Sequence, residues 1–355
     1  METSLILLTI ISSCVGFIVS FLLIPKFKTF LHNIDILAID QQKKEKPRIA
    51  TSGGIPIAIG FFTAIMVFLI LKTYFPLTFN FNINYDYILA ACLTSLFIAL
   101  VGFFDDIYLK KVKTKTNDTA EYRIGLSQWM KPLITLQAAL PLVVIINNYS
   151  NLAIPFIGKI ELGVIIPLII IPIVIMGVSN AFNMFAGKNG LEAGLGIQAF
   201  LFLGLIGITL GKNEMTLLCF ISMACLLAFL KFNWYPASIL PGDSLTYFTG
   251  GAFASAIILG GSQVIFYAGI IFIPWILEAI LKLRGNFKKK SLGELQKDGT
   301  LKAPYDKIYS LNHIVMKIPE WFDMKRRFKE SEIAVILISF ASLFSLAAFI
   351  LVTIL

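Results

Sequence analysis

The sequence is divided into apolar runs of about 20 residues, the length at which a helix crosses the roughly 30 Å hydrocarbon core of a membrane. Such runs are expected near 4–24, 53–72, 87–104, 132–147, 162–180, 191–210, 215–231, 245–260, 263–283 and 332–354. Charged residues make up 14% of the 355 residues, against about a quarter in soluble domains, and the mean hydropathy is +0.82. The sequence therefore predicts an all-α integral membrane protein with about ten transmembrane helices, organised as a single domain over residues 1–355.

Basic residues are distributed unevenly between the two sets of loops that ten spans define. The segments 25–52, 105–131, 181–190, 231–244 and 282–331 hold 27 of the 30 lysines and arginines. Because basic loops remain in the cytoplasm, this set is expected to be cytoplasmic and both termini external. The net charge of +9 is therefore concentrated on one face, where it fits membrane topology and anionic lipid or the binding of anionic substrates, and fits nucleic acid poorly.

The segment 284–331 is the longest polar insertion and is expected to form a cytoplasmic loop between the ninth and tenth spans. Basic residues alternate over 317–329 with apolar residues that include Trp321, Phe322 and Phe328. This alternation predicts an amphipathic helix that lies at the membrane surface.

Acidic and amide side chains stand at the ends of three apolar runs. Asp105 and Asp106 close the third run, and two adjacent carboxylates need either solvent or a cation and hydrogen bonds around them. Asp243 precedes the eighth run, where it suits either a helix N-cap or a Mg²⁺ ligand. Asn180 and Asn183 share one helix face, and amides there either pack helices together or bind a ligand.

A loop that contains two glycines follows these asparagines. Gly187 and Gly190 bracket the loop, with Asn189 between them, and bare backbone of this kind can approach a phosphate closely. Glu192 stands at the start of the next helix, where a negative charge is favourable with or without a ligand. Lys131 stands at the start of the fourth run, where a lysine commonly extends to the membrane surface.

These residues predict a metal-dependent enzyme that acts on phosphates. Oxygen donors in a chain with only two histidines favour Mg²⁺, or Mn²⁺, over zinc. Such a site suits phosphoryl transfer, which depends on positioning and on neutralisation of charge. The alternative is a secondary transporter of an anionic solute, but transporters place charged groups near the bilayer midplane, whereas these carboxylates stand at helix ends.

Four ordered motifs resemble those of the polyprenyl-phosphate N-acetylhexosamine-1-phosphate transferases: "GFFDD", "NAFNMFAGKNGLEAG", "PGDSLTYFTGG" and "DGTLKAPYDKIYSLNHIVMK". That family has ten helices, external termini and cytoplasmic active-site loops. Bacterial members typically have Asp at the position of Ala186 and a histidine cluster where this chain has only His313. The chain is therefore most similar to the eukaryotic and archaeal branch, which transfers N-acetylglucosamine 1-phosphate from UDP-N-acetylglucosamine to dolichyl phosphate at the start of N-glycan assembly. Another UDP-N-acetylhexosamine would serve the same chemistry.

The resemblance implies roles for individual residues. Asn183 and Asp243 would bind Mg²⁺ together with the donor diphosphate, and Asp105 and Asp106 would lie near the acceptor phosphate. Lys131 would contact phosphate. The remaining residues implied in substrate binding are Asn180, Gly187, Asn189, Gly190, Glu192, Arg284 and His313. The resemblance also implies dolichyl or another polyprenyl phosphate as acceptor, a multi-pass location in the cell membrane with the active site facing the cytoplasm, and a homodimer.

Overall fold

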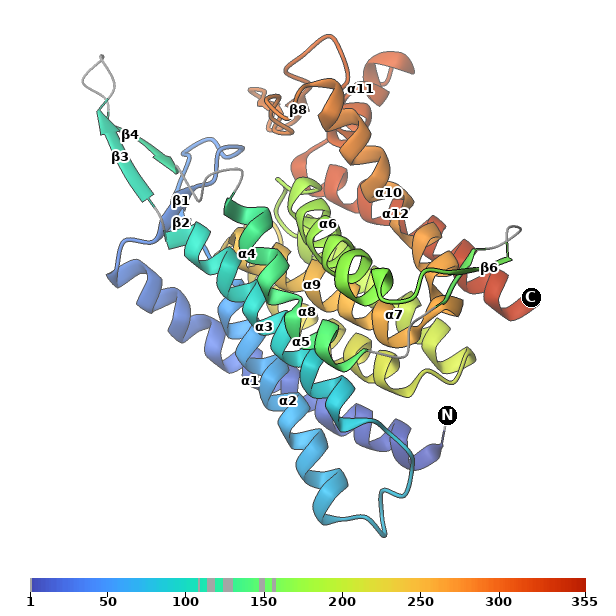
Figure 1. Ribbon diagram of the computed structural model, residues 1–355. Coiled ribbons are helices and arrows are strands. Elements are labelled where there is room, and N and C mark those ends of the chain that lie inside the picture. The colour runs from blue at the N-terminus through green and yellow to red at the C-terminus, as the bar shows by residue number, and fades with distance from the viewer. Residues whose placement is uncertain (1, 108, 114–118, 124–129, 147–150, 155–157) are drawn as a thin grey trace.

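The computed structural model describes residues 2–107, 109–113, 119–123, 130–146, 151–154 and 158–355 (Figure 1). Its long helices are α1 (Thr3–Asn33), α2 (Gly54–Tyr74), α3 (Tyr85–Ile107), α6 (Ile171–Met184) with the preceding π-helical turn η1 (Ile166–Ile170), α7 (Leu191–Thr209), α8 (Asn213–Asn233), α9 (Gly242–Gly260), α10 (Ser262–Arg284) and α12 (Glu330–Ile354). Its short helices are α4 (Met130–Ala138), α5 (Leu140–Ile145) and α11 (Leu311–Trp321).

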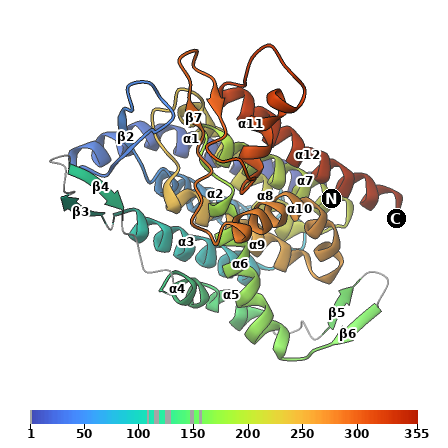
Figure 2. The ribbon, with the colours of Figure 1, turned by 90° about the horizontal axis from the view of Figure 1, so that it is seen from above.

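Four antiparallel hairpins connect the helices. They pair β1 (Leu37–Ile39) with β2 (Arg48–Ala50), β3 (Leu109–Lys113) with β4 (Thr119–Arg123), β5 (Asn151–Ile154) with β6 (Gly158–Glu161), and β7 (Glu294–Leu295) with β8 (Leu301–Lys302). Both termini and the β5–β6 hairpin lie at one end of the helix bundle, and the β1–β2 and β3–β4 hairpins lie at the other (Figures 1 and 2).

Within the described residues, eight helices are long and apolar enough to cross a membrane, so the chain is a mostly helical integral membrane protein. The runs expected at 132–147 and 245–260 correspond to the α4–α5 pair and to α9. α9 is rich in glycine, serine and threonine and is buried along nearly its whole length. Its low hydropathy is explained by packing against α3, α6 and α8 rather than against lipid.

Two predicted boundaries are wrong. α1 does not end at residue 24 but continues through Pro25 to Asn33. The amphipathic helix expected over 317–329 is instead α11, which ends at Trp321. Asp323 has a positive φ of +46°, which a continuing right-handed helix cannot contain.

Candidate active site

The candidate site is built around the first turn of α9. Gly102 of α3 packs so tightly there that a Cβ atom on it would lie 2.4 Å from the Asp243 carbonyl oxygen. A Cβ atom on Gly54 of α2 would lie 2.2 Å from the Ser244 carbonyl carbon. Glycine alone leaves room for such backbone contacts. The end of α3 and the start of α2 are therefore brought directly onto the residues that begin α9.

Asp106 caps the start of α9 across the helix interface. Its Oδ1 accepts a hydrogen bond from the Asp243 N–H at 2.8 Å, and its Oδ2 accepts one from the Ser244 N–H at 3.0 Å. The first N–H groups of a helix have no partner within the helix, and a carboxylate complements them. Asp106 is 1% exposed, which gives it a positioning role. Asp105 is 9% exposed and is not among the described residues that line the neighbouring cavity.

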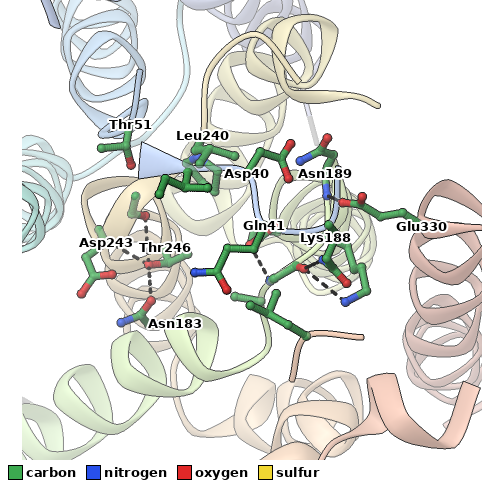
Figure 3. Close-up of a pocket in the computed structure, with 18 residues that line it drawn as sticks. Asp40, Gln41, Thr51, Asn183, Lys188, Asn189, Leu240, Asp243, Thr246 and Glu330 are labelled. Atoms are coloured by element: carbon green, nitrogen blue, oxygen red, sulfur yellow. Dashed lines mark hydrogen bonds between the residues drawn. The ribbon is translucent and has the colours of Figure 1, made fainter. Parts of the chain in front are cut away.

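That cavity, of about 240 Å³, lies between α6, α7, α9 and the β1–β2 hairpin. Its polar lining includes Asp40, Asn183, Lys188, Asn189, Glu192, Asp243 and Glu330. Figure 3 shows Asp243, Thr246 and Asn183 together on one side of the cavity, and Lys188, Asn189 and Glu330 on the opposite side. Residues from distant segments therefore converge on one polar chamber.

Asn183 and Asp243 form an oxygen donor set that fits Mg²⁺. The Thr246 hydroxyl donates to Asn183 Oδ1 at 3.1 Å, which ties the end of α6 to α9 one turn after Asp243. Within the described residues, no group of three or more His, Cys, Asp or Glu side chains could hold a metal ion. One carboxylate and one amide oxygen suit Mg²⁺ because this ion keeps several waters and takes further oxygens from substrate phosphates. Both residues predicted as metal ligands thus face the same cavity.

The loop between α6 and α7 is held by side chains around it. The Gly187 N–H donates to Glu192 Oε1 at 2.9 Å, and the Gly190 N–H donates to Asn233 Oδ1 at 3.0 Å. Gly187 and Gly190 have φ values of +108° and +82°, which favour glycine. Because both N–H groups already have protein acceptors, the structure does not support the expectation that this backbone cradles a phosphate. The two glycines shape the loop instead.

Glu330 at the start of α12 joins this loop to the β1–β2 hairpin. Its Oε1 accepts from the Asn189 N–H at 2.8 Å, and its Oε2 pairs with Lys43 Nζ at 2.5 Å. Lys43 also lies 3.2 Å from Asp40 Oδ2. The sequence analysis did not identify Asp40 or Glu330, because neither stands in a recognisable motif and only the fold brings them together.

Lys188 is a further cavity residue that the sequence analysis did not identify as a ligand. It is 3% exposed, and burial lowers the pKa of its ammonium group to about 8, although Glu330 and Glu192 oppose this shift. The signal available in the sequence was its position between two glycines of the loop. That position does not indicate burial, because a lysine is rarely buried without a charged partner.

Four predicted substrate-binding residues, Asn180, Gly190, Arg284 and His313, do not line the cavity within the part of the chain described. Asn180 links α6 to α9, because its Nδ2 donates to the Met176 carbonyl at 2.8 Å and its Oδ1 accepts from the Tyr247 hydroxyl at 2.8 Å. Arg284 is exposed at the end of α10. Lys131 lies in the first turn of α4, and its side chain is outside the described residues.

His313, another of these four residues, is fully buried in α11. The Tyr309 N–H donates to its Nδ1 at 3.2 Å, so its Nε2–H donates to the Lys290 carbonyl at 3.0 Å. Burial lowers the pKa of His313 to about 4. Its imidazole is therefore neutral at physiological pH and holds the α10–α11 loop together, which does not match the expected phosphate contact.

Comparison of its sequence with known proteins places the chain in a family. The sequence pattern of glycosyl transferase family 4 matches residues 88–261. A Saccharolobus solfataricus protein, provisionally named UDP-N-acetylglucosamine–dolichyl-phosphate N-acetylglucosaminephosphotransferase, is 36% identical over 317 residues, or 88% of this chain and 87% of the relative. A Sulfolobus acidocaldarius protein of the same name is 30% identical over 318 residues, or 89% and 87%.

A second kind of relative, matched over a shorter part of the chain, carries a different name. The phospho-N-acetylmuramoyl-pentapeptide-transferase of Wolbachia pipientis is 38% identical over 243 residues, which are 65% of this chain and 72% of that protein. The family pattern covers α3 to α9, and the matches to the archaeal proteins cover most of the chain. The chain therefore belongs to the polyprenyl-phosphate N-acetylhexosamine-1-phosphate transferases of glycosyl transferase family 4.

Proposed function

We propose that this protein transfers N-acetylglucosamine 1-phosphate from UDP-N-acetylglucosamine to dolichyl or another polyprenyl phosphate and releases UMP. The names of the two archaeal relatives support both substrates. The structural observation that carries the proposal is the meeting of Asp243 from α9 and Asn183 from α6 at one cavity. Such a pair of oxygen donors suits a Mg²⁺ ion that also binds a diphosphate.

In the proposed reaction, an oxygen of the acceptor phosphate attacks the β-phosphorus of the donor. The bond from that phosphorus to the bridging oxygen breaks, and UMP leaves with the electron pair. Both reactants are anionic, so Coulomb repulsion is the main obstacle. Mg²⁺ held by Asn183 and Asp243 would offset much of this charge. Asp106 keeps the start of α9 in place, and we assign the orientation of the acceptor phosphate to Asp105.

We place the cavity on the cytoplasmic side of a ten-span protein. The α4–α5 pair and α9 would supply the two spans beyond the eight apolar helices. The β1–β2 hairpin beside the cavity lies at the end of the bundle opposite both termini. The loops assigned to that end carry 27 of the 30 basic residues, and basic loops remain in the cytoplasm.

The test is a reconstituted reaction with purified protein, UDP-N-acetylglucosamine, Mg²⁺ and a polyprenyl phosphate. We expect UMP and a polyprenyl-diphosphate-linked sugar in equal amounts, and no product after chelation of the metal. Asp243→Asn should reduce UMP release at least about a hundredfold. Asp323→Asn, at an exposed loop position, is the matched control. Wild-type rates in Asp243→Asn would show that the metal assignment is wrong.

The same preparation separates the transferase from a transporter. A transporter in sealed vesicles would accumulate the sugar nucleotide without releasing UMP. A panel of UDP-amino sugars in the reconstituted reaction would then identify the preferred donor.

A further inference from the structure

The family resemblance implied that Arg284 and His313 bind the substrate, but neither brings a positive charge to the cavity. Arg284 is exposed at the end of α10, and the buried His313 uses both ring nitrogens on backbone groups. Lys43, near the cavity, is already paired with Glu330 and Asp40. Among the described residues, a basic side chain that meets the donor diphosphate beside Mg²⁺ must therefore be another one.

Lys188 is the basic residue among the described residues that line the cavity. It shares the lining with four carboxylates, which are Asp40, Glu192, Asp243 and Glu330. A lining with this excess of negative charge repels a diphosphate unless a cation offsets it. Lys188 lies across the cavity from Asp243 and Asn183 (Figure 3), so a diphosphate between the two sides could contact both.

The ammonium group of Lys188 has N–H donors without an acceptor among the described residues. Its contact is to the Gly187 carbonyl at 3.2 Å, and within the described chain it has no carboxylate oxygen inside the 4.0 Å limit of an ion pair. A lysine ammonium has three N–H donors. Of the carboxylates that face it, Glu330 is engaged by Lys43 and Asn189. Glu192 accepts from the Gly187 N–H through Oε1, while its Oε2 has no hydrogen-bond partner among the described residues. A buried ammonium with unused donors is costly unless a ligand completes it.

We infer that Lys188 binds the diphosphate of the sugar-nucleotide donor. This inference rests on the proposed function. Its N–H groups would donate to diphosphate oxygens from the side of the cavity opposite Asp243 and Asn183. Lys188 then supplies the positive charge that Arg284 and His313 do not supply.

The test measures binding of UDP, UMP and uridine, each with Mg²⁺, to the full-length wild type and to Lys188→Gln and Lys188→Met. Loss of one charge-assisted hydrogen bond should weaken UDP binding about tenfold or more. UMP binding should weaken less, and uridine binding should not change. Unchanged uridine binding also shows that the variants fold. The Michaelis constant for the donor should rise, while that for the acceptor lipid should not.

Lys44→Gln is the control, because Lys44 is an exposed lysine in the loop of the β1–β2 hairpin, which lies beside the cavity. It should bind all three ligands as the wild type does. Equal losses for UDP and uridine in the Lys188 variants would overturn the inference, and so would unchanged UDP binding while the wild type remains active. If the wild type neither binds UDP nor releases UMP, the proposed function itself fails.

Discussion

Asp106 and Asp243 are 137 residues apart in the sequence, yet the backbone N–H of Asp243 donates to Asp106 Oδ1 at 2.8 Å. The other oxygen of Asp106 accepts from the Ser244 N–H at 3.0 Å. One carboxylate from α3 therefore fixes the first turn of α9, and with it the point from which the Asp243 side chain reaches the cavity. The family resemblance grouped Asp106 with Asp105 beside the acceptor phosphate, whereas these contacts assign it to positioning.

This relationship predicts that Asp106→Asn will destabilise the protein as well as inactivate it. An amide offers one acceptor oxygen instead of two and places an NH₂ group against a backbone N–H. Losses at helix caps cost about 1–2 kcal/mol, so the thermal midpoint should fall along with UMP release. Asp86→Asn, in the exposed first turn of α3, should change neither. Loss of activity at wild-type stability would instead indicate direct contact of Asp106 with substrate.

A second prediction concerns the close approach of α3 to α9. In Gly102→Ala the new Cβ atom would lie 2.4 Å from the Asp243 carbonyl oxygen, and two helix backbones cannot adjust as a flexible side chain can. Overpacking of this kind costs about 1–3 kcal/mol, and UMP release should fall at least about tenfold because Asp243 is displaced. Gly177→Ala on α6 meets no atom within 4 Å and should retain activity. Similar activity in both variants would argue against this role for Gly102.

The sequence predicted that Asn183 and Asp243 lie on one side of the bilayer, and the family resemblance implied that they meet at one site. Each stands at an end of a membrane helix, and the alternation of spans places both ends on the same side of the bilayer. It was harder to predict which of the adjacent residues Asp105 and Asp106 faces α9. Successive residues on a helix point about 100° apart, so Asp106 can face α9 while Asp105 does not, but only the packing of α3 shows which one does.

The rest of the cavity could not be predicted because its residues come from segments without local signals. Glu330 begins α12 and resembles any acidic residue at a helix N-terminus, yet it pairs with Lys43, 287 residues away. The interior position of α9 likewise accounts for its small and polar residues, which contact protein.

A third prediction concerns Gln42, which joins three segments around the cavity. Its Nε2 donates to the Gly187 carbonyl at 2.7 Å, and its Oε1 accepts from the Gly293 N–H at 3.0 Å. Gln42 is 5% exposed, and each lost bond costs about 1 kcal/mol. Gln42→Ala should therefore raise the Michaelis constant for the donor roughly tenfold and leave that for the acceptor unchanged.

Gln296→Ala is the control for Gln42, because the one hydrogen bond of the Gln296 side chain within the described residues is to the Glu294 carbonyl on its own hairpin. Limited proteolysis adds an independent measurement. The segment after α10 should be cleaved faster in Gln42→Ala than in the wild type or in Gln296→Ala. Unchanged kinetics and unchanged cleavage would show that Gln42 does not couple these segments.

A fourth prediction follows from the lowered pKa of Lys188. Burial brings this pKa to about 8, Glu330, Glu192 and Glu278 oppose the shift, and Lys43 adds to it. UDP should bind the protonated ammonium, so its affinity should be constant below pH 8 and weaken above it, because binding then requires uptake of a proton. The dissociation constant should rise roughly tenfold between pH 7 and pH 9. The UDP phosphates do not titrate in this range, and Lys188→Gln should lose the weakening above pH 8. An equally steep profile in Lys188→Gln would assign the titration to another group.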